Sequence, residues 1–107
     1  MDGRCLIDGV TIIAFAPYEL KEYTLPNMVE HLGYGVFSNS HLSALRLPVS
    51  LRSIGEYALD NFEGTLYINS NIEEGSFSLN QLSTVIFGPN VTTVANIYYH
   101  GVTILRM

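Results

Sequence analysis

The sequence is poor in cysteine, in charged side chains and in long apolar segments, and each shortage excludes a class of protein. Cys5 is the single cysteine, so an internal disulfide and a site built from several thiolates are excluded. Charged residues make up 14% of the 107 positions, and 5 basic residues are outnumbered by 10 acidic ones. The net charge of −5 argues against nucleic acid or an anionic membrane as the main partner. No apolar run is long enough to cross a bilayer, so we expect no membrane insertion.

Motifs for catalysis and for metal or cofactor binding are also missing. His31, His41 and His100 lie in different parts of the chain, without the short spacing of metal ligands. Cys5 lies in an apolar run that favours a buried, unreactive thiol. We therefore expect a protein that is not an enzyme and that binds no metal and no cofactor. The opening residues MDGRCLIDG lack the basic segment and apolar core of a signal peptide, so the residues alone leave the cellular location unknown.

Apolar residues recur along the chain in a pattern that repeats several times. Each copy has two apolar residues separated by one position, as in Leu45-Arg46-Leu47, which is the alternation of a short strand. Successive copies begin 19 to 22 residues apart, a spacing typical of a solenoid. The first apolar column comprises Tyr23, Leu45, Leu66, Val85 and Leu105, and the second comprises Leu25, Leu47, Ile68, Phe87 and Met107.

Each copy is expected to form one turn of the chain around a shared core. Pro26 and Pro48 follow the first two strands and end them, because proline cannot donate to the ladder. The chain then returns along the far side, and compact turns at Gly33 and Gly55 bring it back. Neighbouring units must stack to bury their apolar edges, so we predict that the strands form one parallel sheet.

The sequence therefore predicts a single domain over residues 1–107 that is mainly β, with short helical or 3-10 turns. The expected repeat units are residues 20–41, 42–64, 65–81, 82–101 and a partial unit at 102–107.

The first residues depart from the repeat. Asp8-Gly9 stands between two apolar runs, the strongest short-range signal for a two-residue hairpin turn. We predict a β-hairpin over residues 4–15 that covers one end of the stack. Alternatively, Val10 and Phe15 form the tail of a degenerate repeat, because the interval from Phe15 to the next unit matches that in a later copy.

The stretches YTLPNMVEHLGYGVF and LRLPVSLRSIGEYAL resemble the BspA-like leucine-rich repeat. The opening segment DGRCLIDGVTIIAFAP is similar to one that often precedes such repeats in gut Bacteroides proteins. Where the family has a column of cysteines, this chain has Ser40, Phe62 and Asn80. The resemblance implies a right-handed solenoid of the α/β leucine-rich-repeat superfamily. It also implies an exported or cell-surface adhesion protein that binds a protein or a glycan.

Residues that alternate with the buried columns are expected to face outward on the sheet. The two outward columns are Glu22, Ala44, Thr65, Thr84 and Ile104, and Thr24, Arg46, Tyr67, Ile86 and Arg106. From these we select, as candidate ligand-binding residues, Glu22, Thr24, Arg46, Tyr67, Thr84, Ile86 and Arg106. Tyrosine and arginine are over-represented at interaction hot spots, which favours Arg46 and Tyr67. The alternative is that this face is simply the solvated side of a sheet.

Two classes of function fit these features. The first is a non-catalytic, adhesion-type module that binds a protein or a glycan, as a fragment or a short relative of a cell-surface protein. The second is a structural spacer or capping segment of a longer solenoid, with no binding site of its own. An aromatic and arginine patch over adjacent strands favours binding, whereas scattered serine and threonine would favour a spacer.

The C-terminal stretch NIYYHGVTILRM is rich in apolar residues and carries no segment that resembles a cap. Its last strand would present unpaired backbone groups beside an apolar face. We therefore predict self-association through this end, most simply as a two-fold homodimer. The alternative is a monomer whose end is shielded by Tyr98, His100 and Arg106. The residues assigned to the contact are Ile97, Tyr98, Val102, Ile104 and Leu105.

Overall fold

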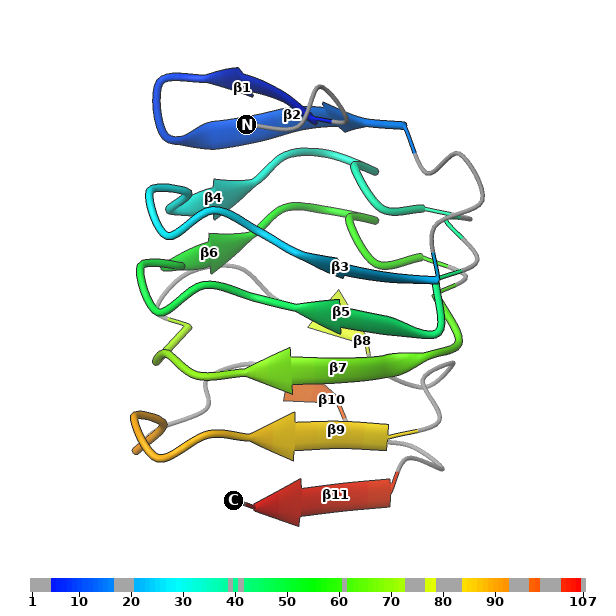
Figure 1. Ribbon diagram of the computed structural model, residues 1–107, viewed down its shortest axis with the longest axis vertical. Coiled ribbons are helices and arrows are strands. Elements are labelled where there is room, and N and C mark those ends of the chain that lie inside the picture. Colours follow the sequence, from blue (N-terminus) through cyan, green and yellow to red (C-terminus); the bar gives the residue numbers. More distant parts are fainter. Residues whose placement is uncertain are drawn as a thin grey trace.

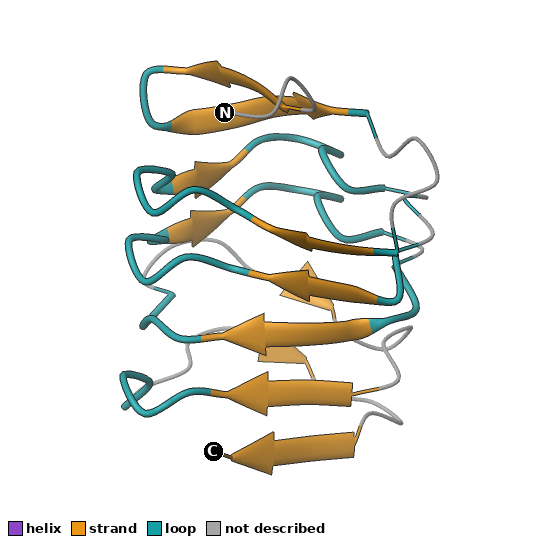
Figure 2. Ribbon diagram, viewed as in Figure 1, coloured by secondary structure: helices purple, strands orange, loops and turns teal. Residues whose placement is uncertain are grey.

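The computed structural model of the protein describes residues 5–16, 21–38, 40, 42–60, 62–72, 77–78, 84–92, 97–98 and 103–106. These residues form short strands joined by turns, and they contain no helix (Figure 2). The helical or 3-10 turns expected from the sequence are therefore absent from the described segments. The strands are β1 (Cys5–Asp8), β2 (Thr11–Phe15), β3 (Glu22–Thr24), β4 (His31–Leu32), β5 (Ala44–Arg46), β6 (Ser53–Ile54), β7 (Thr65–Ile68), β8 (Phe77–Ser78), β9 (Thr84–Phe87), β10 (Ile97–Tyr98) and β11 (Thr103–Arg106).

One strand from each unit contributes to a 5-stranded parallel sheet in the order β11-β9-β7-β5-β3. The strands lie one above another in chain order in Figure 1. The register places Tyr23 beside Leu45, Leu45 beside Leu66, and Leu66 beside Val85. From β3 to β9 both predicted apolar columns are buried, which confirms the alternation read from the sequence for these four strands. Side-chain ladders of this kind form the core between the sheet and the returning chain.

The prediction of a single parallel sheet is wrong, because the returning segments also pair. β4 pairs in parallel with β6, with Leu32 beside Ile54, and β8 pairs in parallel with β10. The strands stack at the same spacing on both sides of each unit, so extended residues on the return side meet their neighbours in ladder geometry. These pairings involve strands of 2 residues, too short to show any apolar alternation.

The N-terminal strands belong to the sheet on the return side. β1 pairs with β2 antiparallel across Gly9, whose φ is 64°. β2 also pairs in parallel with β4, which places Ile12 beside Leu32. β2 is therefore both the second strand of an antiparallel pair with β1 and a parallel neighbour of β4. Phe15 packs its ring against Phe37 at 4.9 Å between centroids.

The last strand is one residue out of the predicted phase. Its register places Ile104 beside Val85 and Leu105 beside Ile86, so Leu105 joins the outward column and is 51% exposed. Arg106 stands beside the buried Phe87 and not in the outward row. The cause is the interval from Val85, which is 19 residues to Ile104 and 20 to Leu105. Because side chains alternate with a period of two, a slip of one residue exchanges the two faces of a strand.

Candidate binding face

Part of the predicted outward set lies in one row on adjacent strands of the five-stranded sheet. The ladder pairs Thr24 with Arg46, Arg46 with Tyr67, and Tyr67 with Ile86. Neighbouring strands lie about 4.8 Å apart, so these side chains are within contact distance of one another. We call Arg46, Tyr67 and Ile86 the outer row. It combines a guanidinium, an aromatic ring and an aliphatic group on three adjacent strands.

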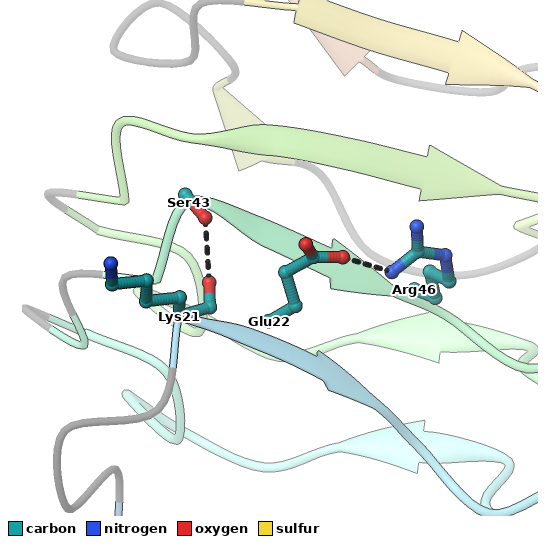
Figure 3. A network of polar contacts seen from close by, with 4 residues as sticks. All are labelled: Lys21, Glu22, Ser43 and Arg46. Atoms are coloured by element: carbon teal, nitrogen blue, oxygen red, sulfur yellow. Dashed lines mark hydrogen bonds and ion pairs between the residues drawn. The ribbon is translucent and has the colours of Figure 1, made fainter.

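Arg46 is held by contacts on both sides. Its Nη1 donates to Oε1 of Glu22 at 2.9 Å, as Figure 3 shows, and the two side chains are 40% and 58% exposed. Its Cζ lies 4.6 Å from the centroid of the Tyr67 ring, in a cation–π contact. The hydrogen bond to Glu22 raises the pKa of Arg46 further above its ordinary value, at which the guanidinium is already charged at physiological pH. The face thus presents a charged group whose position is fixed.

Ala44 was predicted to face outward, yet it is buried, with 8% of its surface exposed. It pairs directly with Glu22, whose carboxylate reaches past it to Arg46 further along the neighbouring strand. A methyl group at position 44 leaves room for this diagonal contact. The Ser43 hydroxyl donates to the carbonyl oxygen of Lys21 at 2.8 Å, and this bond joins the residues that directly precede β5 and β3 (Figure 3).

An open pocket of about 410 Å³ lies where the strands of the sheet end. The outer row contributes three of the residues that line it. The others are two buried apolar residues and three residues of the turns that follow the strands, and none of these five is among the predicted binding residues. The lining residues are Arg46, Leu47, Tyr67, Ile68, Asn69, Ile86, Gly88 and Pro89. Asparagine, glycine and proline after consecutive strands were the available signal for this pocket.

The remaining candidates lie elsewhere. Glu22 and Thr24 are on β3, the edge strand, and Thr84 begins β9 beside Thr65; none of the three lines the pocket. Ile97 and Tyr98 form β10 beside β8 on the return side, so they are in a different sheet from Ile104 and Leu105. Val102 lies outside the described residues.

The described segments contain no group of three or more side chains suited to holding a metal ion. They also contain no helix that is long and apolar enough to span a membrane.

Repeated parallel strands with leucine and isoleucine ladders are features of a leucine-rich-repeat protein. Residues 10–106 match the BspA-type leucine-rich repeat region in 6 copies, and the chain belongs to this family. The resemblance drawn from the sequence is confirmed. No curated protein and no solved structure matches the chain.

Proposed function

We propose that the chain is a non-catalytic binding module whose ligand contacts the outer row. The observation that carries this proposal is the alignment of Arg46, Tyr67 and Ile86 on adjacent strands around one open pocket. Arginine and tyrosine are enriched at binding hot spots, and aliphatic groups beside them supply area that can be dehydrated. Membership of a repeat family of this kind supports the same use.

The ligand that fits this face best, within the class of proteins and glycans, is an extended protein segment. Leu47, Ile68 and Pro89 give the pocket an apolar lining, and Arg46 supplies one cation at its edge. A ligand with an apolar side chain next to a carboxylate would fill the pocket and compete with Glu22 for the guanidinium. The family supports a location at the cell surface or outside the cell, and an adhesive role there.

We also propose that the units form one continuous right-handed solenoid, with residues 4–15 covering its N-terminal end. The parallel registers support it: consecutive units pair throughout on the strand side, and on the return side the first unit pairs with the second and the third with the fourth. Cys5, Ile7 and Phe15 pack against the core from the N-terminal side, as a cap would.

The alternative function is that of a spacer within a longer solenoid. One observation favours the spacer. Arg46 already forms an ion pair with Glu22, so part of the charge on this face is neutralised within the chain. A spacer requires only that its strands stack, and it would lose nothing when the outer row is changed.

Selection from a random peptide library displayed on phage distinguishes these functions. We expect peptides to be enriched on the wild-type chain, and their binding to be lost in Tyr67→Ala and weakened in Arg46→Ala. Asp60→Ala, an exposed change on a turn outside the pocket, is the matched control and should bind as the wild type does. Selected peptides that bind all four proteins equally, or no enrichment at all, would favour the spacer.

Self-association through the C-terminal end is a separate proposal. β11 ends the order of the five-stranded sheet, and Leu105 on it is 51% exposed. Two copies related by a two-fold axis would pair their β11 strands antiparallel and extend the sheet across the contact. Light scattering at micromolar concentration should then give twice 11.9 kDa for the wild type. Leu105→Glu should return the monomer mass, and Glu22→Ala, on the opposite edge strand, should not; a monomeric wild type contradicts the proposal.

A further inference from the structure

Tyr57 adopts a backbone conformation that is unfavourable for a tyrosine. Its φ is 58°, and no other non-glycine residue in the described segments has a positive φ. The corresponding turn of the preceding unit has Gly35 in this conformation, with a φ of 61°. Residues that carry a β-carbon rarely occupy this region, and a bulky side chain there is a genuine outlier. Tyrosine at position 57 therefore destabilises the folded chain in a way that glycine would not.

Burial does not compensate for this conformation. The Tyr57 side chain is 55% exposed, while the next two residues, Ala58 and Leu59, are buried at 1% and 6%. The core below the turn is thus closed without the tyrosine ring. Strained conformations persist where the surrounding structure enforces them and where function benefits from them. The position of this ring is more readily explained by something outside the chain than by packing within it.

A second tyrosine from the neighbouring unit stands beside it. Tyr34 is 71% exposed, and its ring centroid lies 5.5 Å from that of Tyr57, with the ring planes at 80°. The turns that carry the rings follow β4 and β6 and run side by side (Figure 1). They are tied together because Gly35 N donates to Glu56 O at 3.0 Å. We call Tyr34 and Tyr57 the aromatic ledge, which is open to solvent.

The openness and charge of the ledge limit the ligands that suit it. A cation gains most from an aromatic ring when it is shielded from water, and these rings do not enclose a ligand. Nucleic-acid bases also stack on tyrosine. However, Glu56 on the same turn is exposed, and the chain carries a net charge of −5, so a polyanion would be repelled.

A neutral ligand with both an apolar face and hydroxyl groups fits these features. The C–H groups of a sugar ring are weakly electropositive, and they can contact the electron-rich face of a phenol ring. The sugar hydroxyls can donate to the Glu56 carboxylate and exchange hydrogen bonds with the tyrosine hydroxyls. We propose that Tyr34, Tyr57 and Glu56 form a carbohydrate-binding site on the turns after β4 and β6. This site is separate from the outer row and does not depend on the function proposed for that row.

Native gel electrophoresis through gels containing soluble β-glucan, xylan, mannan or galactan tests the proposal. We expect at least one of these polysaccharides to retard the wild-type chain, because a polymer offers the ledge many equivalent units. Retardation should be lost in Tyr34→Ala and in Tyr57→Asn, and it should persist in Tyr67→Ala, which changes the outer row. The last variant separates this site from the function proposed above.

Thermal unfolding of the same variants distinguishes a ligand-binding role of Tyr57 from a role in packing. Loss of a packing residue would lower the Tm, whereas loss of a binding residue would not. Asparagine tolerates a positive φ, so Tyr57→Asn should melt at or above the wild-type Tm while losing retardation. A lower Tm for Tyr57→Asn would show that the ring serves stability and would overturn the proposal. Equal retardation of all variants would overturn it, as would the absence of retardation by any of the four polysaccharides. If the two rings bound a protein and no polysaccharide retarded the chain, the ligand of the ledge would be a protein, and the carbohydrate proposal would be overturned.

Discussion

Consecutive units are joined by hydrogen bonds on the segment that follows each sheet strand, and we call such a contact between two units a joint. The joint between the first two units and the joint between the third and fourth units accept a hydrogen bond there with different chemical groups. In the first pair, the N–H of Arg52 donates to the backbone carbonyl of Glu30 at 2.7 Å. In the second pair, Thr92 stands the same number of residues after Thr84, the start of β9, as Arg52 does after Ala44, the start of β5. Its N–H donates to Oδ1 of Asn71 at 2.8 Å. An asparagine side chain thus takes the place of a backbone carbonyl.

Asparagine side chains make two further hydrogen bonds between the third and fourth units. Asn69 Oδ1 accepts a hydrogen bond from Asn90 N at 2.9 Å, and Asn71 Nδ2 donates to the Thr92 hydroxyl at 3.0 Å. Asparagine carries an acceptor and a donor at the end of a short side chain, which suits it to replace both kinds of backbone group. The stack can therefore continue through a unit whose sequence departs from the pattern of the first two.

The glycines at the two joints are crowded by different neighbours. A β-carbon at Gly55 would lie 2.5 Å from the carbonyl oxygen of Leu32 and 3.0 Å from the carbonyl carbon of Gly33. A β-carbon at Gly88 would instead collide with the side chain of Asn69. An added β-carbon would thus meet backbone at Gly55 and a side chain at Gly88, although Gly88 N also donates to the backbone oxygen of Ile68 at 2.8 Å. The second joint should therefore tolerate change that the first cannot.

The largest effect is expected inside the sheet that both joints share. Leu47 is 5% exposed, and Leu47→Asp would bury an unpaired carboxylate at a cost of several kcal/mol, on the order of the whole stability of a small domain. We expect this variant to be unfolded by circular dichroism at room temperature. Leu47→Met, which keeps an apolar side chain of similar volume, is the control and should remain folded. A cooperative wild-type-like melt of Leu47→Asp would show that the inward face is misassigned.

Substitutions at Gly55 and Gly88 should give the next largest loss of folding stability. Gly55→Ala should destabilise the chain by about 2–3 kcal/mol, because neither carbonyl that crowds the site can move without breaking the stack. Gly88→Ala should also destabilise it, by about 1–2 kcal/mol, through its collision with Asn69. Urea unfolding of both variants measures these changes.

A second substitution, Asn69→Ala, should reduce the stability loss at one of the two glycines and not at the other. Shortening Asn69 to alanine removes the two nearest atoms that a β-carbon at position 88 would meet, Oδ1 and Cγ, and leaves only the Cβ at 3.0 Å, so Gly88→Ala should cost less in an Asn69→Ala background. Gly55→Ala should cost the same in either background. If the two substitutions at positions 69 and 88 were additive, the proposed role of the asparagine in the second joint would be wrong.

The asparagine bonds themselves should have a smaller effect. Asn71→Ala removes the acceptor for Thr92 N and the donor to the Thr92 hydroxyl, so we expect a loss of about 1–2 kcal/mol. Ser50→Ala is the matched change at the first joint, because the Ser50 hydroxyl donates to Val29 O at 2.7 Å beside an intact backbone contact. It should cost about 0.5–1 kcal/mol. Equal losses for the two variants in urea unfolding would show that the joints do not differ in this way.

The strand positions could be read from the sequence because leucine, isoleucine and valine recur at nearly constant intervals. The return side could not, since β4 and β6 have 2 residues each and leave no alternating pattern. Their pairing follows from the pitch of the stack, which is a property of the assembled units. The register of β11 could not be predicted for a related reason. Ile104 and Leu105 are adjacent apolar residues, so the sequence allows either of them to face the core, and in the structure Ile104 is the one that pairs with the buried Val85.

The candidate site, too, was predictable from the sequence only in part. The alternation predicted that Arg46 and Tyr67 would be neighbours on the outer face, and the register confirms it. The contact of Arg46 with Glu22 is diagonal and depends on the small side chain at Ala44, which a column of residue types does not reveal. The strain at Tyr57 is equally invisible in the sequence, since it appears only when its turn is compared with that of Gly35.

The smallest expected effect is at Arg46. Its ion pair with Glu22 is exposed at both ends, so it should contribute less than about 1 kcal/mol, and the cation–π contact with Tyr67 adds about 0.5–1 kcal/mol at most. Arg46→Ala should therefore melt within a few degrees of the wild type, in contrast to the neighbouring Leu47→Asp. Added salt should narrow the remaining difference, because it screens the ion pair and leaves the apolar part of the contact unchanged. A difference in Tm that is large and independent of salt would mean that the guanidinium stem packs as part of the core, and that the outer row is a structural feature of the stack more than a binding surface.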